Sequence, residues 1–437
     1  MGARAVALQV LAGSEQGEAF SDELLDNAAA RELKPVDRAL ARELVAGVLR
    51  NRNKLDWILD GSLKRGVASL TIAERNNLRM GVYQVAYLDR VPQFAAVNEC
   101  VNLAKRFGRA GTIGLTNAVL RDIIRKRAWT KPLDIADSYK KLSVEYSHPE
   151  WLVKRWVNQL GTPQASELMS ANNRQAPLTI RVNTLKITLD DLLNILTSSD
   201  YNPRRNRIAP AALDIGEPGD LLRSDLFRQG LFYIQDAAAQ AASLLTRINP
   251  GDSLLDLCSA PGGKLSAAAE AAAPDCLLIG ADITMKKLDR VRQNLKRLGI
   301  GSVRLVCADA AAIAFRRQFD LVLADVPCSG LGVLRRRLDL RWRIGEADIA
   351  RLAALQALIL ENAARLVKPG GRIIYSTCTL TPEENEGQIA RFLGEHKDFR
   401  LVAPDLPMAM LQDSCLYLWP HRHDTDGAFA ACLEKTT

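Results

Sequence analysis

The sequence predicts a multidomain protein with an all-α bundle, a small α/β segment and a C-terminal α/β domain built on a doubly wound parallel sheet. Apolar residues recur at spacings of three and four through residues 3–128, and strand-like and helix-like segments alternate from residue 252 onward. We expect the bundle to span 1–130, a linker 131–147, the small segment 148–240 and the C-terminal domain 241–437.

The N-terminal third reads as a series of amphipathic helices. Their apolar stripes include Val6, Val10 and Leu11, then Leu40, Leu44 and Val48, then Leu78, Val82 and Val85, then Val97 and Val101. Pro35, Gly61, Pro92 and Gly108 separate them. Residues 131–147 contain few periodic apolar residues, which indicates a linker.

The middle segment mixes both kinds of element. A helix is expected from Trp151, a strand over 178–183, a helix over 189–196, and a strand over 230–235 that leads into a helix over 236–245. The C-terminal domain has strand patterns at 254–257, 276–281, 303–307, 319–324 and 371–375. Parallel sheets of this kind bind ligands at the carboxyl ends of their strands.

The run Asp256-Leu-Cys-Ser-Ala-Pro-Gly-Gly-Lys264 follows the first of these strands and precedes a helix. Glycines let the backbone approach a ligand, and the N–H groups of a helix start bind polar or anionic groups. An acidic residue, Asp282, ends the next strand, where such a residue typically accepts hydrogen bonds from ribose hydroxyls. The pattern indicates a nucleoside-containing cofactor, and the absence of G-x-G-x-x-G argues against a nicotinamide or flavin.

Two cysteines each follow a predicted strand. Cys328 lies in Ala324-Asp-Val-Pro-Cys-Ser-Gly330, and Cys378 lies in Tyr375-Ser-Thr-Cys-Thr379. A cysteine thiolate can act as a covalent catalyst when its neighbours stabilise it. Buried, unreactive cysteines are also common at such positions.

With the glycine loop, these two motifs resemble the NOL1/NOP2/sun family of S-adenosylmethionine-dependent RNA cytosine-C5 methyltransferases. With the N-terminal half included, the chain is similar to the bacterial 16S ribosomal RNA type (RsmB/Fmu/Sun). The resemblance covers essentially the full length. It implies a NusB-like RNA-binding bundle, an RNA-recognition-like middle segment and a Rossmann-like S-adenosylmethionine methyltransferase domain. The implied reaction is methylation of cytosine 967 of 16S ribosomal RNA.

The resemblance also implies roles for individual residues. Cys378 corresponds to the nucleophile that adds to C6 of cytosine, and Cys328 to the residue that assists release of the covalent intermediate. Asp325 would line the cofactor site and hydrogen-bond the cytosine. Cofactor contacts fall on Cys258, Ser259, Ala260, Pro261, Gly262, Gly263, Lys264, Asp282, Asp309 and Asp325.

Arginines and one tryptophan are the candidates for contact with RNA. Arginines can bind phosphates, and a tryptophan can stack on a base. The candidates are Arg335, Arg336 and Trp342 after the Cys328 motif, Arg181 and Asn183 in the middle segment, and Arg38 and Arg42 in the bundle. The structural alternatives are a solvated helix face, strand-edge hydrogen bonds and a salt-bridged loop.

Composition limits the remaining possibilities. The net charge is +8, and residues 1–141 carry 23 Lys/Arg against 16 Asp/Glu, an excess of 7, which favours a polyanionic partner. No apolar run is long enough to span a membrane, and no secretory signal is visible. Eight cysteines without a C-x-x-C pair indicate reduced thiols and no zinc site. We expect a cytoplasmic monomer that binds 16S ribosomal RNA, S-adenosylmethionine and no metal.

Other readings remain open at this point. The same chemistry on transfer RNA or on another ribosomal site would use the same motifs, although transfer RNA relatives generally lack the NusB-like bundle. A non-catalytic NusB-like RNA-binding factor would not need the two cysteines or the glycine loop. A DNA methyltransferase would place its nucleophile in the Pro-Cys motif, without a Thr-Cys motif.

Overall fold

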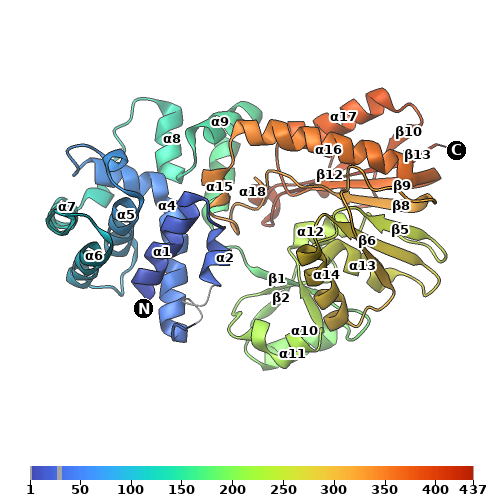
Figure 1. Cartoon of the computed structure of the whole chain (residues 1–437), viewed down its shortest axis with the longest axis horizontal. Coiled ribbons are helices and arrows are strands. Elements are labelled where there is room, and N and C mark those ends of the chain that lie inside the picture. Colours follow the sequence, from blue (N-terminus) through green and yellow to red (C-terminus); the bar gives the residue numbers. More distant parts are fainter. Residues whose placement is uncertain (1, 27–31, 437) are drawn as a thin grey trace. The chain divides into compact units, whose positions relative to one another are not determined.

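The chain folds into two compact units in a computed structural model that describes residues 2–26 and 32–436 (Figure 1). One unit contains Met1–Arg174 and Leu334–Arg343, and the other contains Gln175–Val333 and Ile344–Thr437. The described part of the chain has no helix that is both long and apolar enough to cross a membrane.

The first unit is all-helical, as the apolar spacing predicts. Its α-helices are α1 (Ala3–Gln16), α2 (Ser21–Leu25), α4 (Pro35–Asp60), α5 (Ile72–Tyr87), α6 (Gln93–Phe107), α7 (Thr112–Lys126), α8 (Ser138–Tyr146), α9 (Glu150–Asn173) and α15 (Leu340–Arg343). Short 3-10 turns lie at Val67–Ser69 and Ala128–Thr130. Local sequence sets several of these boundaries. Pro35 occupies the first turn of α4, and Thr71 and Glu74 form a capping box at the start of α5.

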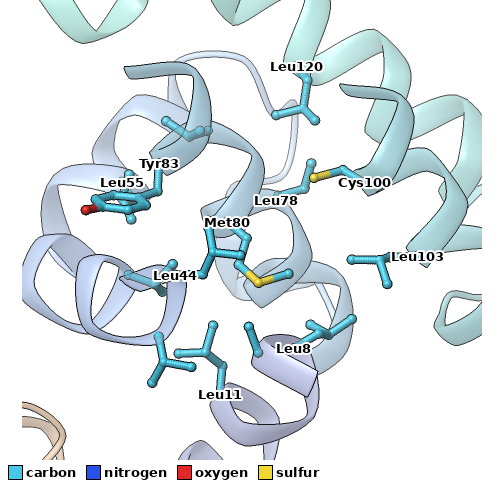
Figure 2. Packing of buried hydrophobic residues seen from close by; sticks show 14 of the residues in the cluster. Leu8, Leu11, Leu44, Leu55, Leu78, Met80, Tyr83, Cys100, Leu103 and Leu120 are labelled. Atoms are coloured by element: carbon cyan, nitrogen blue, oxygen red, sulfur yellow. The ribbon is translucent and has the colours of Figure 1, made fainter. Parts of the chain in front are cut away.

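The core of this unit lies between α1, α4, α5, α6 and α7 (Figure 2). Its buried side chains include residues of the predicted stripes, such as Leu11, Leu44 and Leu78. They also include Leu8, Leu55, Met80, Cys100, Leu103 and Leu120. Helices α4 and α5 approach closely at Gly47, where a Cβ atom would lie only 1.9 Å from Cζ of Tyr83. Any larger residue at this position would require the Tyr83 side chain to move.

Two segments of this unit differ from the expectation. Residues 131–147, predicted as a linker, contain helix α8, which Asp137 caps by accepting a hydrogen bond from the N–H of Lys140 at 2.7 Å. Residues Leu334–Arg343 belong to the helical unit although they follow the Cys328 motif in sequence. Leu338 joins the helical core, so long-range packing decides the place of this segment.

The second unit begins with a small antiparallel sheet in the order β2-β3-β1-β4. Its strands are β1 (Leu178–Val182), β2 (Pro203–Arg205), β3 (Ala212–Ile215) and β4 (Phe232–Ile234), accompanied by α10 (Leu189–Ser198), a 3-10 turn at Leu221–Arg223 and α11 (Asp225–Arg228). The predicted strands at 178–183 and 230–235 pair directly with each other as β1 and β4. Strands β2 and β3 carry too few alternating residues to have been predicted.

The large sheet has the order β11-β12-β13-β9-β8-β5-β6-β7, with β10 paired to β13. Its strands are β5 (Ser253–Asp256), β6 (Leu277–Asp282), β7 (Val303–Cys307), β8 (Phe319–Asp325), β9 (Val367–Thr377), β10 (Phe399–Val402), β11 (Leu411–Gln412), β12 (Cys415–Leu418) and β13 (Ala428–Lys435). Helices α16 (Glu346–Leu366) and α17 (Glu386–Glu395) cover one face, and α12 (Ala237–Ser243), α13 (Gly263–Ala271) and α14 (Met285–Leu298) cover the other (Figure 1).

The predicted Rossmann-like fold class of this domain is therefore confirmed, but its sheet contains antiparallel strands as well as the predicted parallel ones. Strands β5, β6, β7, β8 and β9 are parallel, whereas β10, β11, β12 and β13 pair antiparallel beyond β9. Strand β13 packs against β9 over six residue pairs, from Phe429↔Thr377 to Glu434↔Arg372. A helix α18 (Pro420–His423) and a 3-10 turn at Met408–Met410 lie in the same C-terminal region.

Candidate active site

The glycine loop lies between the end of β5 and the start of α13. Gly262 has a φ of +103°, a conformation that favours glycine. Ser259 donates its N–H and its hydroxyl to the carbonyl of Ala281, at 2.8 and 3.0 Å. The N–H of Ala260 donates to Oδ2 of Asp282 at 3.1 Å. The loop is thus fixed against the end of β6, beside the first turn of α13.

Three aspartates end neighbouring strands of this sheet. Asp256 ends β5, Asp282 ends β6 and Asp325 ends β8. Asp256 is buried, and burial together with the charge of Asp325 raises its pKa to about 8. Asp256 is not among the predicted site residues, although its position at a strand end just before the glycine loop is a signal in the sequence.

This acidic edge fits the chemistry of S-adenosylmethionine, which carries a cationic sulfonium, an ammonium group and a ribose diol. Asp282 is buried, and the Nζ of Lys287 lies 3.1 Å from its Oδ1. Asp309, which follows β7, is exposed and accepts a hydrogen bond from the N–H of Ala311 at 2.9 Å. Carboxylates at these strand ends suit the ribose hydroxyls and the positive charges of the donor.

Lys264 pairs with Asp325 rather than remaining free for a cofactor carboxylate. Its Nζ lies 2.7 Å from Oδ2 of Asp325, and the hydroxyl of Ser376 donates to Oδ1 of Asp325 at 2.7 Å. Burial alone would lower the pKa of Lys264, but the negative charges of Asp325 and Cys378 raise it above its ordinary value. Lys264 therefore stays charged and interacts electrostatically with both groups.

The two motif cysteines meet at the ends of the adjacent strands β8 and β9. The Sγ atoms of Cys328 and Cys378 lie 3.2 Å apart, and the N–H of Cys378 donates to Sγ of Cys328 at 3.3 Å. The hydrogen bond with Cys378 and burial raise the pKa of the Cys328 thiol well above its ordinary value. Cys328 is thus a neutral thiol at physiological pH, directly beside Cys378.

The other cysteines lie outside this pair, and all eight are free thiols. Cys258, in the glycine loop, has a pKa raised well above its ordinary value by burial and by the neighbouring aspartates. Across residues 2–26 and 32–436, no group of three or more His, Cys, Asp or Glu side chains is arranged to hold a metal ion.

Arg181 and Asn183, candidates for RNA contact, connect the small sheet to helices α13 and α14. Arg181 is buried and donates to the carbonyl of Gly263 at 2.6 Å, and its Nη2 lies 2.8 Å from Oε1 of Glu270 on α13. The buried Asn183 donates to the carbonyls of Gly230 and Leu298 at 2.8 and 2.9 Å. A contact with RNA by either side chain would require these bonds to open.

The remaining candidates belong to the helical unit. Arg335 is buried, and Arg336 is exposed. The indole N–H of Trp342 donates to the carbonyl of Leu49 at 3.0 Å, and its ring packs against the helical core. Arg38 donates to the carbonyl of Leu33 at 3.0 Å, and the exposed Arg42 lies 3.6 Å from Asp26. Trp342 could therefore stack on a base only with a ring that already packs against the helical core.

Three family models together match most of the chain. Residues 243–434 match the 16S rRNA methyltransferase RsmB/F model. Residues 1–125 match the NusB family, and residues 148–221 match the ferredoxin-like domain of RsmF/B-like methyltransferases. The ferredoxin-like description agrees with the small antiparallel sheet and its helices.

Curated relatives and solved structures agree with these matches. The chain is 34% identical to the probable ribosomal RNA small subunit methyltransferase B of Synechocystis sp., over 99% of each chain. It is 36% identical to the ribosomal RNA small subunit methyltransferase B of Sodalis glossinidius, over 93% of this chain and 91% of that one. The crystal structure of PH0851 superposes with a TM-score of 0.83 at 26% identity, over 100% of this chain and 99% of that one.

A methyltransferase homolog from Pyrococcus horikoshii superposes with a TM-score of 0.61 at 29% identity and covers 69% of this chain and 100% of its own. The fold, the glycine loop and the acidic strand ends are those of a methyltransferase whose cofactor is S-adenosylmethionine. Full-length similarity to its members shows that the chain belongs to the ribosomal RNA small subunit methyltransferase B family.

Proposed function

We propose that this protein transfers a methyl group to C5 of one cytosine of 16S ribosomal RNA, cytosine 967 by the family resemblance. The reaction would pass through a covalent bond between Sγ of Cys378 and C6 of the cytosine. The observation that carries the proposal is the pair of thiols 3.2 Å apart at the ends of β8 and β9. The Lys264–Asp325 ion pair supports the proposal, because Lys264 also interacts electrostatically with Cys378.

C5 of cytosine is a weak nucleophile, so a nucleophile must add to C6 before C5 can accept the methyl group. S-adenosylmethionine supplies an electrophilic methyl group on a sulfonium. The Cys378 thiolate adds to C6, which makes C5 an enamine carbon. The electron pair of this enamine would form the bond to the methyl group while the bond between the methyl group and the sulfonium breaks and S-adenosylhomocysteine leaves. A base then removes the proton from C5. The electron pair of that C–H bond restores the ring double bond, and the C6–sulfur bond breaks.

The neighbouring side chains can assist each of these events. The charge of Lys264 favours the thiolate form of Cys378. We assign Asp325 to hold Lys264 and to hydrogen-bond the cytosine edge; a carboxyl group that carries a proton there would donate it to N3 and so offset the negative charge that develops on the ring. The neutral thiol of Cys328 can donate a hydrogen bond to the Cys378 sulfur as it leaves C6, which assists release.

The proposed substrate is RNA of the small ribosomal subunit, because relatives bearing that name align over nearly the full chain. The NusB match covers the basic N-terminal third, and exposed arginines such as Arg42 and Arg336 suit phosphate contacts. The target base must leave its stack to reach the cysteines, as enzymes that modify bases generally require. The exposed basic side chains therefore serve to hold the RNA while one base is extruded.

The test is a denaturing gel of the Cys328→Ala variant incubated with S-adenosylmethionine and unmodified 16S ribosomal RNA. We expect a slowly migrating protein–RNA band that disappears in the Cys328→Ala, Cys378→Ala double variant. A Cys307→Ala variant is the control, because Cys307 is an exposed free thiol outside the pair. Mapping 5-methylcytosine in RNA treated with the wild-type enzyme identifies the methylated position.

Each outcome has a distinct meaning. Methylation of transfer RNA or of another ribosomal position would keep the chemistry and correct the substrate. Methyl transfer by the Cys378→Ala single variant would remove Cys378 as the nucleophile. Binding of RNA without any methyl transfer by the wild-type protein would indicate a non-catalytic RNA-binding factor.

A further inference from the structure

A buried polar network lies behind the two cysteines, in the turn that follows Cys378. Its centre is Glu384, which is fully buried and ends the 3-10 turn Pro382–Glu384. Oε1 of Glu384 accepts hydrogen bonds from the N–H of Ser329 at 2.8 Å and from Nε2 of Gln356 at 2.9 Å. Oε2 accepts hydrogen bonds from the hydroxyl of Thr381 at 2.7 Å and from the hydroxyl of Ser329.

These contacts hold the chain on both sides of Cys328. Ser329 is the next residue after Cys328 and gives Glu384 both its N–H and its hydroxyl. Gln356, which bridges from α16, also donates to the carbonyl of Pro327 at 2.9 Å. Glu384 therefore fixes the backbone that carries Cys328.

The next residue, Asn385, does the same for Cys378. It is also fully buried. Its Oδ1 accepts a hydrogen bond from the hydroxyl of Thr377 at 2.6 Å, and its Nδ2 donates to the carbonyl of Thr379 at 3.1 Å. Thr377 and Thr379 flank Cys378 directly. The two consecutive side chains thus hold the residues beside the two cysteines.

One hydrogen bond closes the network between the two loops. The hydroxyls of Ser329 and Thr379 lie 2.7 Å apart, so the residues that follow the two cysteines contact each other. The hydroxyl of Tyr375 donates to the carbonyl of Glu384 at 2.6 Å, which fixes the turn to β9. Because every one of these groups is buried, a broken link leaves a polar atom without a hydrogen-bond partner and destabilises the network.

We propose that Glu384 and Asn385 are positioning residues that hold the thiol of Cys328 beside the sulfur of Cys378. The proposal rests on the proposed function, because it assigns the network to the step in which Cys328 assists release of the methylated RNA. Formation of the bond between Cys378 and C6 does not need Cys328. Loosening the Cys328 loop should therefore slow release more than bond formation.

Glu384→Gln is the main test variant. Glutamine keeps the volume but has only one acceptor oxygen, so its NH2 group would face donors that the carboxylate accepts now. We expect the trapped protein–RNA band to increase about tenfold or more over wild type, toward the level of Cys328→Ala. Multiple turnover should fall in parallel, while the first round of methyl transfer stays close to wild type.

Asn385→Asp and Ser329→Ala extend the test. Asn385→Asp removes the donor to Thr379, and Ser329→Ala removes the hydroxyl that contacts both Glu384 and Thr379. Asn362→Asp is the matched control, because Asn362 is a buried amide on α16 that donates to the carbonyls of Ala310 and Ile313, away from the cysteines. A merely structural effect would lower first-round transfer and turnover together and would leave no trapped band.

The outcomes separate this inference from the proposed function. If Cys328→Ala traps RNA and Glu384→Gln traps no more than wild type, the positioning role is wrong and the cysteine roles stand. If Glu384→Gln does not fold, as judged by its melting curve, Ser329→Ala decides, and a wild-type level of trapped RNA overturns the proposal. If Cys328→Ala itself traps nothing, the assignment of Cys328 to release fails, and this inference fails with it.

Discussion

Replacing Asp256 by asparagine should change how the stability of the second unit depends on pH. Asp256 is 1% exposed, and burial together with the charge of Asp325 raises its pKa from 3.8 to about 8. In the folded protein this carboxyl group therefore keeps its proton at neutral pH, whereas in the unfolded chain it is ionised. The stability that it contributes is fully present below about pH 4 and is lost as the pH rises to about 8.

The magnitude follows from the shift. About four pH units at about 1.4 kcal/mol each correspond to roughly 6 kcal/mol between the two ends of this range. Asparagine does not titrate, and its carbonyl oxygen can still accept the hydrogen bond that the N–H of Cys258 makes to Asp256 at 3.1 Å. The free energy of unfolding of Asp256→Asn, relative to wild type, should rise by about 1.4 kcal/mol per pH unit between pH 5 and 7 and less steeply as the pH approaches 8.

The assay is urea denaturation followed by circular dichroism at pH 5, 6, 7 and 8, without cofactor. Asp289→Asn, a change at an exposed residue on α14, serves as the control and should give a constant difference from wild type. Parallel stability curves for wild type and Asp256→Asn would refute the reasoning, since they would mean that Asp256 is ionised in the folded protein throughout this range.

Three further predictions test other parts of the molecule. Lys264→Met should lower the rate of methyl transfer in single-turnover assays about 100-fold, because the charge near Cys378 is lost, and Lys264→Arg should recover part of it; an unchanged rate would contradict this role. Arg341→Met should lower the melting temperature of the helical unit by roughly 10 °C, because the fully buried Arg341 donates to the carbonyls of Ser147 and Asn172 and these would lose their donor. Scanning calorimetry checks it, and an unchanged melting temperature would argue against it. The double change Arg38→Glu, Arg42→Glu should weaken RNA binding about tenfold near 0.1 M salt and flatten its salt dependence, measured by filter binding; equal affinity would exclude this surface.

The local features of this protein were predictable because short-range physics sets them. The three- and four-residue spacing of apolar side chains predicted helices α4 and α5, and the strand patterns predicted strands β5 to β9. The glycine loop was recognisable because a strand, a turn that needs φ > 0 at Gly262 and a helix start are contiguous in sequence. The motif cysteines could likewise be assigned to strand ends.

The sequence alone determined which residues could do chemistry, whereas the tertiary structure decided which of them meet. Cys328 and Cys378 are fifty residues apart and come into contact only because β8 and β9 are neighbours in a parallel sheet. Lys264 and Asp325 also meet only in the folded protein. Glu384 likewise accepts hydrogen bonds from Ser329 and Gln356, which lie far from it in sequence, as well as from the nearby Thr381. The antiparallel β13, and the place of residues 334–343 in the helical unit, likewise depend on long-range pairing and packing. Hydrophobic periodicity encodes only the face that a segment buries and not the partner that covers it.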